Sequence, residues 1–342
     1  MLPFFYITNY STMQQKNLLL QFIAFAVLVL LSATSAKASD WTTITNGSVW
    51  YDNNGDTIQA HAPGFLRYNN RWYMVGEDRS GWWNPDANMY SSADLVNWRF
   101  EGKVVRNGVT VAALGKSRFI ERAKIMRNPH TGKFIIWCHW EGEGYRASEA
   151  ACFSADSICG PYKLEWSGRP MGVKSRDCNV FVDNDGSAYF VSTTEENTNI
   201  GIFKLSDDYT KVVSHYSVME DLRREAPVIV NKDGLYYMLS SACTGWAPNQ
   251  CKLSTSKSLN QGWTPLVNIG DDKAFRTQAA AVLEIKGTKQ TTYLYVGDRW
   301  LERSLPSSPI IIFPISFDNG ECQFEYCDSF DINFTTGEVR RH

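Results

Sequence analysis

Five polar residues, spaced at intervals of 60, 56, 48 and 53 residues along the chain, could together form an acid–base site. Each of them leads a short apolar run that is followed by a turn and a second, β-branched or aromatic run. The five residues are His61, Glu121, Asp177, Glu225 and Gln278. If the three carboxyl groups meet, they raise one another's pKa, because they cannot all ionise cheaply in a small volume. A carboxylic acid that stays protonated near neutral pH is what general acid catalysis requires.

The sequence around these leading residues is repeated. EAPVIVNKDGLYYML, from Glu225, aligns without a gap with DCNVFVDNDGSAYFV, from Asp177, and with HAPGFLRYNNRWYMV, from His61. ERAKIMRNPHTGKFIIW and QAAAVLEIKGTKQTTYLYV follow the same pattern with longer turns. An apolar run, a turn with Gly, Asn or Asp and a second apolar run indicate a β-hairpin. Helical periodicity is almost absent, so we expect an all-β fold.

The length of the repeat predicts how the hairpins are arranged. A unit of roughly 50 residues with about four strands is typical of a propeller blade. Five such units fill residues 39–342, so we predict a single domain, a five-bladed β-propeller, closed by a strand near Ser48–Tyr51 that joins the last blade. The alternative, a two-sheet sandwich, would not produce five equivalent hairpins. Since the first strand of each blade lies beside the central axis, the five leading residues should converge at one mouth of the channel.

Converging carboxyl groups favour one reaction over others. The chain has no C-x-x-C pair, no G-x-S-x-G and no phosphate-binding loop, so the zinc, serine-nucleophile and nucleotide signatures are missing and we expect no metal ligands. Glycoside hydrolysis, by contrast, uses a pair of carboxyl groups. The alternative is that individual members of the set cap blades or bind an ion at the axis.

Aromatic side chains could supply flat surfaces for sugar rings. The candidates are Trp82, Trp83, Trp137, Trp140, Tyr145, Trp246 and Trp300. A tryptophan more often packs inside a protein than contacts a ligand, so each of these is weak evidence alone. Trp246 and Trp300 follow the last two repeated hairpins, in the loops expected to border the channel mouth.

Charge and the N-terminal segment bear on partners and location. The formal net charge is −2 and basic residues form no run, which disfavours nucleic acid and anionic membranes as partners. Lys16 precedes an apolar stretch that ends near Leu31, and Ala36-Lys37-Ala38 follows. This order predicts a secretory signal peptide over residues 1–38, hence a secreted protein, extracellular or periplasmic, with no membrane span after cleavage. The alternative is a retained signal-anchor.

The eight cysteines all follow the predicted signal peptide. An even number of cysteines in an oxidising compartment predicts disulfide bonds. Pairing Cys152 with Cys159, Cys243 with Cys251 and Cys322 with Cys327 would pin one loop each, although the sequence leaves the connectivity open.

Several motifs carry a resemblance to a known family. RDCNVFVDNDGSAYF and REAPVIVNKDGLYYM resemble glycoside hydrolase family 43. More narrowly, TIQAHAPG, VGEDRS, SSADLVNW, ERAKI, KSRD, EAPVIV, GWAPN and VGDRW are similar to the exo-β-1,3-galactanases of that family, over about residues 44–300. The resemblance implies hydrolysis with inversion of the anomeric centre and no organic cofactor. A structural calcium ion at the propeller axis remains open.

The resemblance also implies catalytic roles. Glu225 of EAPVIV would be the general acid, and Asp177 of SRDCN would tune its pKa and orient it. The residue usually used as base is missing, because HAPG places Ala62 where most members have an aspartate. In the galactanase-like group this aspartate is also absent, and the resemblance implies that the glutamine corresponding to Gln278 holds the attacking water.

A neutral amide is too weak a base to take a full proton at neutral pH. Either the proton leaves late, through water to Glu121 or another carboxylate, or the amide passes it on as an imidic-acid tautomer. We favour Gln278 as the residue that orients the attacking water, with Glu121 supplying negative potential, since an oxocarbenium-like transition state gains from nearby negative charge. The acid and the group that holds the water should then be about 6.5–9.5 Å apart.

The same motifs suggest a substrate-binding set. It consists of Gln59, His61, Glu77, Tyr145, Trp246, Asp298, Arg299 and Trp300, of which Asp298 and Arg299 could equally form a structural ion pair. The expected function is a secreted, monomeric, inverting exo-β-1,3-galactanase that acts on polysaccharide, β-1,3-galactan, as in arabinogalactan main chains. The alternatives are another family 43 specificity, arabinofuranosidase or xylosidase, and a non-catalytic sugar-binding propeller.

Overall fold

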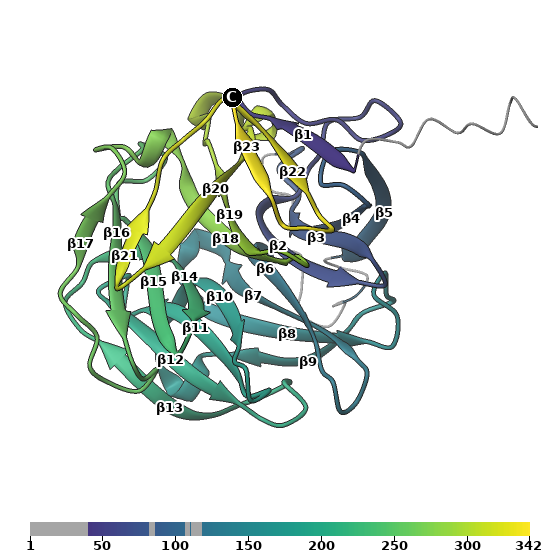
Figure 1. Cartoon of the computed structure of the whole chain (residues 1–342). Coiled ribbons are helices and arrows are strands. Elements are labelled where there is room, and N and C mark those ends of the chain that lie inside the picture. The colour runs from purple at the N-terminus through teal and green to yellow at the C-terminus, as the bar shows by residue number, and fades with distance from the viewer. Residues whose placement is uncertain (1–39, 82–85, 107–109, 111–117) are drawn as a thin grey trace, which may run out of the picture. The chain divides into compact units, whose positions relative to one another are not determined.

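The computed structural model describes residues 40–81, 86–106, 110 and 118–342. Within this part, residues 41–342 form one compact unit built almost entirely of β-strands (Figure 1), so the all-β class is confirmed. The predicted signal peptide, residues 1–38, lies outside the described residues, as do Trp82 and Trp83. The described residues contain no helix long and apolar enough to cross a membrane.

Five sheets each contain four antiparallel strands that follow one another in the chain. The first two sheets consist of β2 (His61–Tyr68), β3 (Arg71–Glu77), β4 (Ala87–Ser92) and β5 (Trp98–Val105), and of β6 (Arg118–Arg127), β7 (Phe134–Gly142), β8 (Glu149–Ala155) and β9 (Lys163–Gly168). The other three consist of β10 (Ser175–Val182), β11 (Ala188–Thr194), β12 (Asn199–Leu205) and β13 (Val212–Met219), of β14 (Arg224–Lys232), β15 (Leu235–Ala242), β16 (Cys251–Ser256) and β17 (Val267–Ile269), and of β18 (Gln278–Lys286), β19 (Thr291–Asp298), β20 (Ile310–Asp318) and β21 (Glu321–Gln323). Short 3₁₀ helices lie in the connections: η2 (Glu143–Tyr145), η3 (Pro170–Gly172), η4 (Ala274–Arg276) and η5 (Glu302–Ser307).

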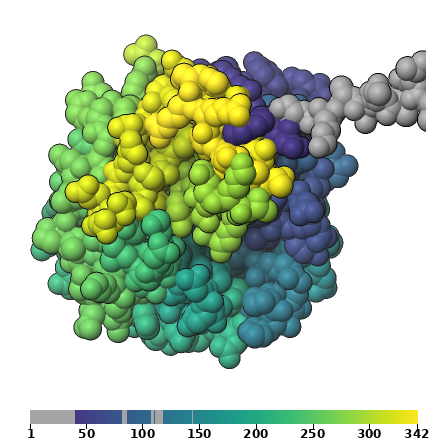
Figure 2. Space-filling view, viewed as in Figure 1, coloured from purple at the N-terminus to yellow at the C-terminus, as the bar shows by residue number. Residues whose placement is uncertain are grey.

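A sixth sheet joins the two ends of the described chain. In it, β1 (Trp41–Thr45) pairs with β22 (Ser329–Asn333), which pairs in turn with β23 (Val339–Arg341). Figure 2 shows the purple N-terminal segment against the yellow C-terminal one. The prediction of a five-bladed propeller is therefore wrong, because the all-β propeller comprises six sheets.

The sequence repeat does not reveal the sixth sheet, because the paired strands of this sheet lie far apart in the sequence. Its pairing of Trp41 with Asn333 joins residues from opposite ends of the chain, so no local hairpin marks it. The predicted closing strand near Ser48–Tyr51 does not join the last four-stranded sheet, and Tyr51 makes an isolated bridge to Thr57. The pairing of β1 with β22 hydrogen-bonds the two ends of the described chain to each other.

The predicted hairpin leaders lie on equivalent strands. Each leader is at or near the start of the first strand of a four-stranded sheet, and the strands β2, β6, β10, β14 and β18 contact one another in turn, with β18 returning to β2. They pack closely: a Cβ on Gly64 would lie 2.6 Å from the Cα of Lys124 on the neighbouring strand. These first strands thus form an inner ring, which brings the leaders toward one place.

Every inner strand contains a β-bulge close to its leading residue. The pairing register shifts between His61 and Gly64, Glu121 and Lys124, Ser175 and Cys178, Glu225 and Val228, and Ala279 and Ala281. In three strands the residue after the leader is left-handed without being glycine: Ala62 has φ 45°, Arg122 has φ 51° and Ala226 has φ 52°. Such a conformation costs on the order of 1–3 kcal/mol, and bulges are a known means of re-aiming side chains.

The backbone N–H of each left-handed residue is bound by a carboxylate from another sheet. Ala62 N donates to Asp298 Oδ2 at 3.0 Å, and Arg122 N donates to Glu77 Oε1 at 3.1 Å. Ala226 N donates to Asp177 Oδ2 at 3.0 Å. Charge-assisted bonds of this kind offset part of the conformational cost, and they tie each bulge to the sheet beside it.

A lysine side chain lies inside the inner ring. Lys124 is almost fully buried, and its ammonium donates to the carbonyl oxygens of Ala62, Pro63 and Ala280 at 2.8 Å each. These carbonyls belong to β2 and β18, so one cation links three inner strands. Apolar side chains fill the spaces between neighbouring sheets around it.

The cysteines do not form the predicted loop disulfides. All eight are in the described residues, and each is a free thiol. Cys152 packs in the apolar cluster on one face of its sheet, whereas Cys159 contacts the cluster on the other face. Cys251 is buried, whereas Cys243 is exposed.

Replacing Lys124 by methionine should destabilise the protein, because the carbonyls of Ala62 and Pro63 would lose this donor, whereas Ala280 O would keep the hydrogen bond from Asn179 Nδ2. We expect the free energy of unfolding to fall by about 3 kcal/mol or more, since each unsatisfied buried polar group costs roughly 1–3 kcal/mol. Urea unfolding followed by tryptophan fluorescence measures this, and Lys286→Met, at an exposed position on β18, is the matched control. Equal stability of the two variants would show that the Lys124 ammonium does not hold the ring together.

Candidate active site

A pocket of about 290 Å³ opens at one end of the inner ring. Its walls are formed by Glu77, Arg79, Glu121, Arg122, Tyr145, Asp177, Glu225, Gly245, Trp246, Gln278 and Trp300. Four of the five leading residues therefore converge as predicted. The fifth, His61, is buried beside Trp300, with ring centroids 5.7 Å apart, and does not line this pocket.

Glu225 combines a raised pKa with hydrogen bonds from neutral amides. Burial, together with the negative charge of Asp177, raises the pKa of Glu225 to about 7. Its oxygens accept hydrogen bonds from neutral amides, at 2.9 Å from Asn197 Nδ2 and 3.4 Å from Gln278 Nε2. A carboxyl group in this environment is protonated over much of the neutral range and can act as an acid.

The other pocket carboxylates are paired with cations. Glu77 contacts Arg79, Glu121 contacts both Arg79 and His139, and Asp177 contacts Arg122. Within the described part of the chain, Glu225 has no such ion pair among the salt bridges. Direct pairing with a cation thus distinguishes the other three carboxyl groups from Glu225, the candidate proton donor.

Asp177 is held in one position beside the acid. Its Oδ2 atom accepts a hydrogen bond from Ala226 N at 3.0 Å and contacts Arg122 Nε at 2.8 Å. Ala226 follows Glu225 directly, so Asp177 is anchored to the backbone that carries the acid. This geometry suits a carboxylate that tunes and orients Glu225.

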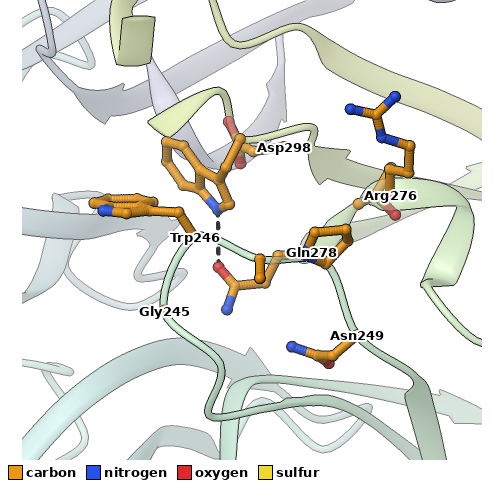
Figure 3. Close-up of a pocket in the computed structure, with 10 residues that line it drawn as sticks. Gly245, Trp246, Asn249, Arg276, Gln278 and Asp298 are labelled. Atoms are coloured by element: carbon orange, nitrogen blue, oxygen red, sulfur yellow. Dashed lines mark hydrogen bonds between the residues drawn. The ribbon is translucent and has the colours of Figure 1, made fainter. Parts of the chain in front are cut away.

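The amide of Gln278 is fully engaged. Its Oε1 accepts hydrogen bonds from Arg122 Nη2 at 2.5 Å and Trp300 Nε1 at 2.9 Å, the latter drawn as the dashed line in Figure 3. Its Nε2 donates to Ser241 Oγ at 3.0 Å and reaches Glu225 Oε2 at 3.4 Å. The expected separation of about 6.5–9.5 Å between acid and water-holding group is thus not met by this pair, because Gln278 touches Glu225.

Arg122 was not identified from the sequence, although it directly follows the leader Glu121. Besides Asp177 and Gln278, its guanidinium contacts Ala279 O at 3.1 Å, and it is almost fully buried. One side chain therefore orients both the carboxylate and the amide that flank Glu225. Two basic residues two positions apart on a mostly buried inner strand, Arg122 and Lys124, were the signal that could have revealed it.

Glu121 and Tyr145 form the opposite wall. Glu121 Oε1 accepts a bond from Arg79 at 2.9 Å, and Tyr145 OH makes a short hydrogen bond to Glu121 Oε2. Although burial raises the pKa of Glu121, bonding to His139 and the charges of Arg79 and His139 outweigh it and hold the pKa well below its usual range. Glu121 therefore stays ionised, as expected for a source of negative potential.

Aromatic residues close one side of the pocket. The rings of Trp246 and Trp300 meet edge to face with centroids 5.2 Å apart, and Arg79 lies over the Trp246 ring at 5.7 Å. Figure 3 shows Trp246 and Gln278 facing a common space in a smaller adjoining pocket, which Asp298 also lines. Both tryptophans are thus placed where sugar rings could stack.

Three expected sugar-binding residues have other partners. Gln59 Nε2 donates to Pro306 O at 2.9 Å, and Arg299 Nη2 donates to Phe275 O at 3.1 Å. Asp298 lies 3.4 Å from His61 Nδ1 and binds the bulge on β2 instead of pairing with Arg299. These contacts support the inner ring and the loops around it.

A propeller whose central pocket holds a carboxyl group with a raised pKa beside ion-paired carboxyl groups has the groups that glycoside hydrolysis uses. The sequence model of glycosyl hydrolases family 43 matches residues 57–292, and the chain belongs to this family. The comparison with curated proteins found no match.

Solved structures similar to this chain include two exo-β-1,3-galactanases. The one from Clostridium thermocellum is 34% identical with a TM-score of 0.83, over 88% of this chain and 68% of that one. The one from Phanerochaete chrysosporium, with β-1,3-galactotriose, is 31% identical with a TM-score of 0.82, over 88% and 70%. A family 43 β-1,3-galactosidase with galactodeoxynojirimycin is 31% identical with a TM-score of 0.76, over 83% and 99%.

Titration of Glu225 can be followed directly by carbon NMR on protein labelled with ¹³C-glutamate. We expect one carboxyl signal, absent from Glu225→Gln, to titrate with a midpoint of about 7. In Asp177→Asn the midpoint should fall by about one pH unit, because removal of a neighbouring negative charge favours the ionised form. Asp233→Asn, in the exposed β14–β15 turn, should leave it unchanged. A midpoint near the ordinary value for glutamate in the parent protein would contradict the assignment.

Proposed function

We propose that this protein is a secreted, inverting exo-β-1,3-galactanase that releases galactose from β-1,3-galactan, such as the main chain of arabinogalactan. The observation that carries the proposal is Glu225, an acid with a raised pKa that stands without a cation between Asp177 and Gln278.

The relatives support galactan as the substrate class. Two of them are exo-β-1,3-galactanases by name, at 31–34% identity over 88% of this chain. Variants of the Phanerochaete enzyme with one glutamate replaced by glutamine or alanine were solved with β-1,3-galactotriose. An α-L-arabinofuranosidase of Clostridium thermocellum is 21% identical and shares the fold alone.

In the proposed reaction, Glu225 protonates the glycosidic oxygen as the bond to the anomeric carbon breaks. The negative charge that remains on Glu225 is stabilised by the hydrogen bond from Asn197 Nδ2. Asp177 keeps the acid protonated before the reaction, because its own charge disfavours a second anion nearby. Ionised Glu121 stabilises the positive charge that develops on the sugar ring.

The attacking water needs a partner other than a conventional base. Arg122 and Trp300 both donate to Gln278 Oε1, and an imidic O–H at that atom would face two donors. The geometry therefore favours the neutral amide over the imidic-acid tautomer. We propose that Gln278 separates from Glu225 when the sugar enters, orients the water, and leaves proton loss until after the new bond has largely formed.

The proposal includes export and independence from an organic cofactor. Export follows from the signal pattern of residues 1–38. Hydrolysis by Glu225 and water uses only groups that the chain supplies, and the Lys124 ammonium already binds three carbonyls within the inner ring. We propose that the protein acts as a monomer, and that any calcium ion near the axis would be structural.

Glu225→Gln should reduce hydrolysis of linear β-1,3-galactan by at least about a thousandfold, because the amide cannot donate the proton that the leaving group needs. Galactose binding, measured by calorimetry, should survive, which separates an enzyme from a non-catalytic sugar-binding propeller. Glu321→Gln, at an exposed position on β21, is the matched control. A Glu225→Gln variant that cleaves as fast as the parent would remove the acid from the mechanism.

The products test the linkage and the stereochemistry together. Linear β-1,3-galactan should yield galactose as the first and main product, whereas arabinan and xylan should yield little sugar. Inversion at a β-linkage should give α-galactose first, visible by proton NMR before mutarotation. Fresh β-galactose would indicate retention, and faster release from arabinan or xylan would indicate a different specificity.

A further inference from the structure

Behind the pocket wall, an imidazole lies between two carboxylates. His139, on β7, is fully buried, with Nδ1 3.0 Å from Glu121 Oε2 and Nε2 3.0 Å from Glu141 Oε2. Glu121 lines the pocket, whereas Glu141 lies on the far side of the imidazole. The three side chains form a continuous line from the sugar-binding space into the interior.

The inner carboxylate is firmly held as an anion. Glu141 Oε1 accepts backbone N–H groups from Gly142 at 2.8 Å, Ala147 at 2.6 Å and Ser148 at 3.2 Å. Burial raises the pKa of Glu141, but the bond to His139 and these backbone donors outweigh it and lower the pKa. A carboxylate with this many donors stays ionised.

The imidazole between two anions is therefore charged. Burial alone would lower the pKa of His139, but hydrogen bonds to Glu121 and Glu141 raise it to about 9. The ring of Tyr145 faces it edge-on with centroids 5.6 Å apart, whereas the Cys178 thiol of β10 is bonded by the backbone N–H of His139 and not by its ring. Its partner on β8 is Ala150, which carries no charge.

Glu121, the member of this line that borders the pocket, has further charged neighbours. Glu121 also contacts Arg79 and Tyr145 OH, and the charge of Glu121 acts on nearby Glu77. Without the imidazolium, buried Glu121 would keep only Arg79, which it shares with nearby Glu77, and would take up a proton in mildly acidic solution. It would then lose both its negative charge and its fixed hydrogen bond with Tyr145.

We propose that His139 is a positioning residue: its imidazolium, clamped by Glu141, keeps Glu121 ionised and directs Glu121 and Tyr145 toward the sugar. This role rests on the proposed glycoside hydrolysis, but the charge state of His139 does not. The imidazolium never touches the substrate and acts only through Glu121. The protein thereby maintains negative potential at the pocket wall over the pH range in which Glu225 must be protonated.

Nitrogen NMR of ¹⁵N-histidine-labelled protein tests the charge without any substrate. The chain contains five histidines, and the His139 signals are those that disappear in His139→Gln and shift in Glu121→Gln. We expect both ring nitrogens of His139 to carry protons at pH 7 and to titrate near pH 9. A neutral tautomer at pH 7 would overturn the proposal, whatever substrate the protein hydrolyses.

The pH dependence of kcat/KM tests the action through Glu121. With β-1,3-galactotriose as substrate, His139→Gln should match the parent most closely near pH 7 and fall at least tenfold below it at pH 5, because Glu121 then takes up a proton. The fall should be mainly in kcat, with a smaller rise in KM, because the negative charge of Glu121 acts chiefly on the positive charge that develops in the transition state. His130→Gln, at an exposed position, is the control and should follow the parent at both pH values.

A double variant separates positioning from a general structural role. In a Glu121→Gln background, His139→Gln should add no further acidic loss, because the group that titrates is gone. Melting curves and circular dichroism establish that each variant is folded. A parent-like profile for His139→Gln, or an equal acidic loss in the Glu121→Gln background, would refute the role. Absence of hydrolysis in the parent would instead refute the proposed function and leave the NMR test intact.

Discussion

The site depends on carboxylates that bind the backbone of a neighbouring sheet at a bulge. Three inner-ring residues with left-handed conformations, Ala62, Arg122 and Ala226, each donate their N–H to a carboxylate from a neighbouring sheet. The bulges turn the leading side chains toward the pocket, and the carboxylates prevent the strands from relaxing to regular pairing. Asp177 has both duties at once, since it holds the Glu225 backbone and also acts on the Glu225 carboxyl group.

The distribution of cations then determines which carboxyl group can be an acid. Arg79, Arg122 and His139 are buried or nearly so, and they contact three of the four pocket carboxylates. Glu225 has neutral donors instead, so burial and the charge of Asp177 act on it without compensation by a direct ion pair. The same residue type thus has two roles in one pocket, set by whether a cation touches it.

The repeat allowed several site residues to be predicted from the sequence, because the residue that leads each hairpin can be recognised by its position. That reasoning identified Glu121, Asp177, Glu225 and Gln278 as neighbours, and the structure brings all four together. It failed for His61, whose leader position is equivalent but whose side chain lies under Trp300. Position along a strand predicts where a residue lies, whereas packing by large neighbours decides which side chains reach the pocket.

Residues outside the repeat pattern were missed for a related reason. Arg79 follows the end of β3, Asn197 lies in the β11–β12 turn, and His139 is on a second strand. Their roles arise from pairings across sheets, which a local pattern does not encode. The sixth sheet escaped prediction in the same way, because β1 and β22 come from opposite ends of the chain. The predicted disulfides overlooked that cysteines near each other in sequence can face opposite sides of a sheet.

The site combines an acid that keeps its proton near neutral pH, Glu225, with an amide, Gln278, that is a very weak base. Arg122, Trp300 and Ser241 hold Gln278 in one orientation, so it can direct a water molecule but has little capacity to take its proton. Bond cleavage must then run ahead of nucleophilic attack, and positive charge on the sugar ring must be stabilised by the protein. Glu121, held ionised by Arg79 and His139, supplies that stabilisation. Glu225 can keep its proton near neutral pH because no cation of the described residues pairs with it directly, and the wall can be negative because Arg79 and His139 hold Glu121 ionised.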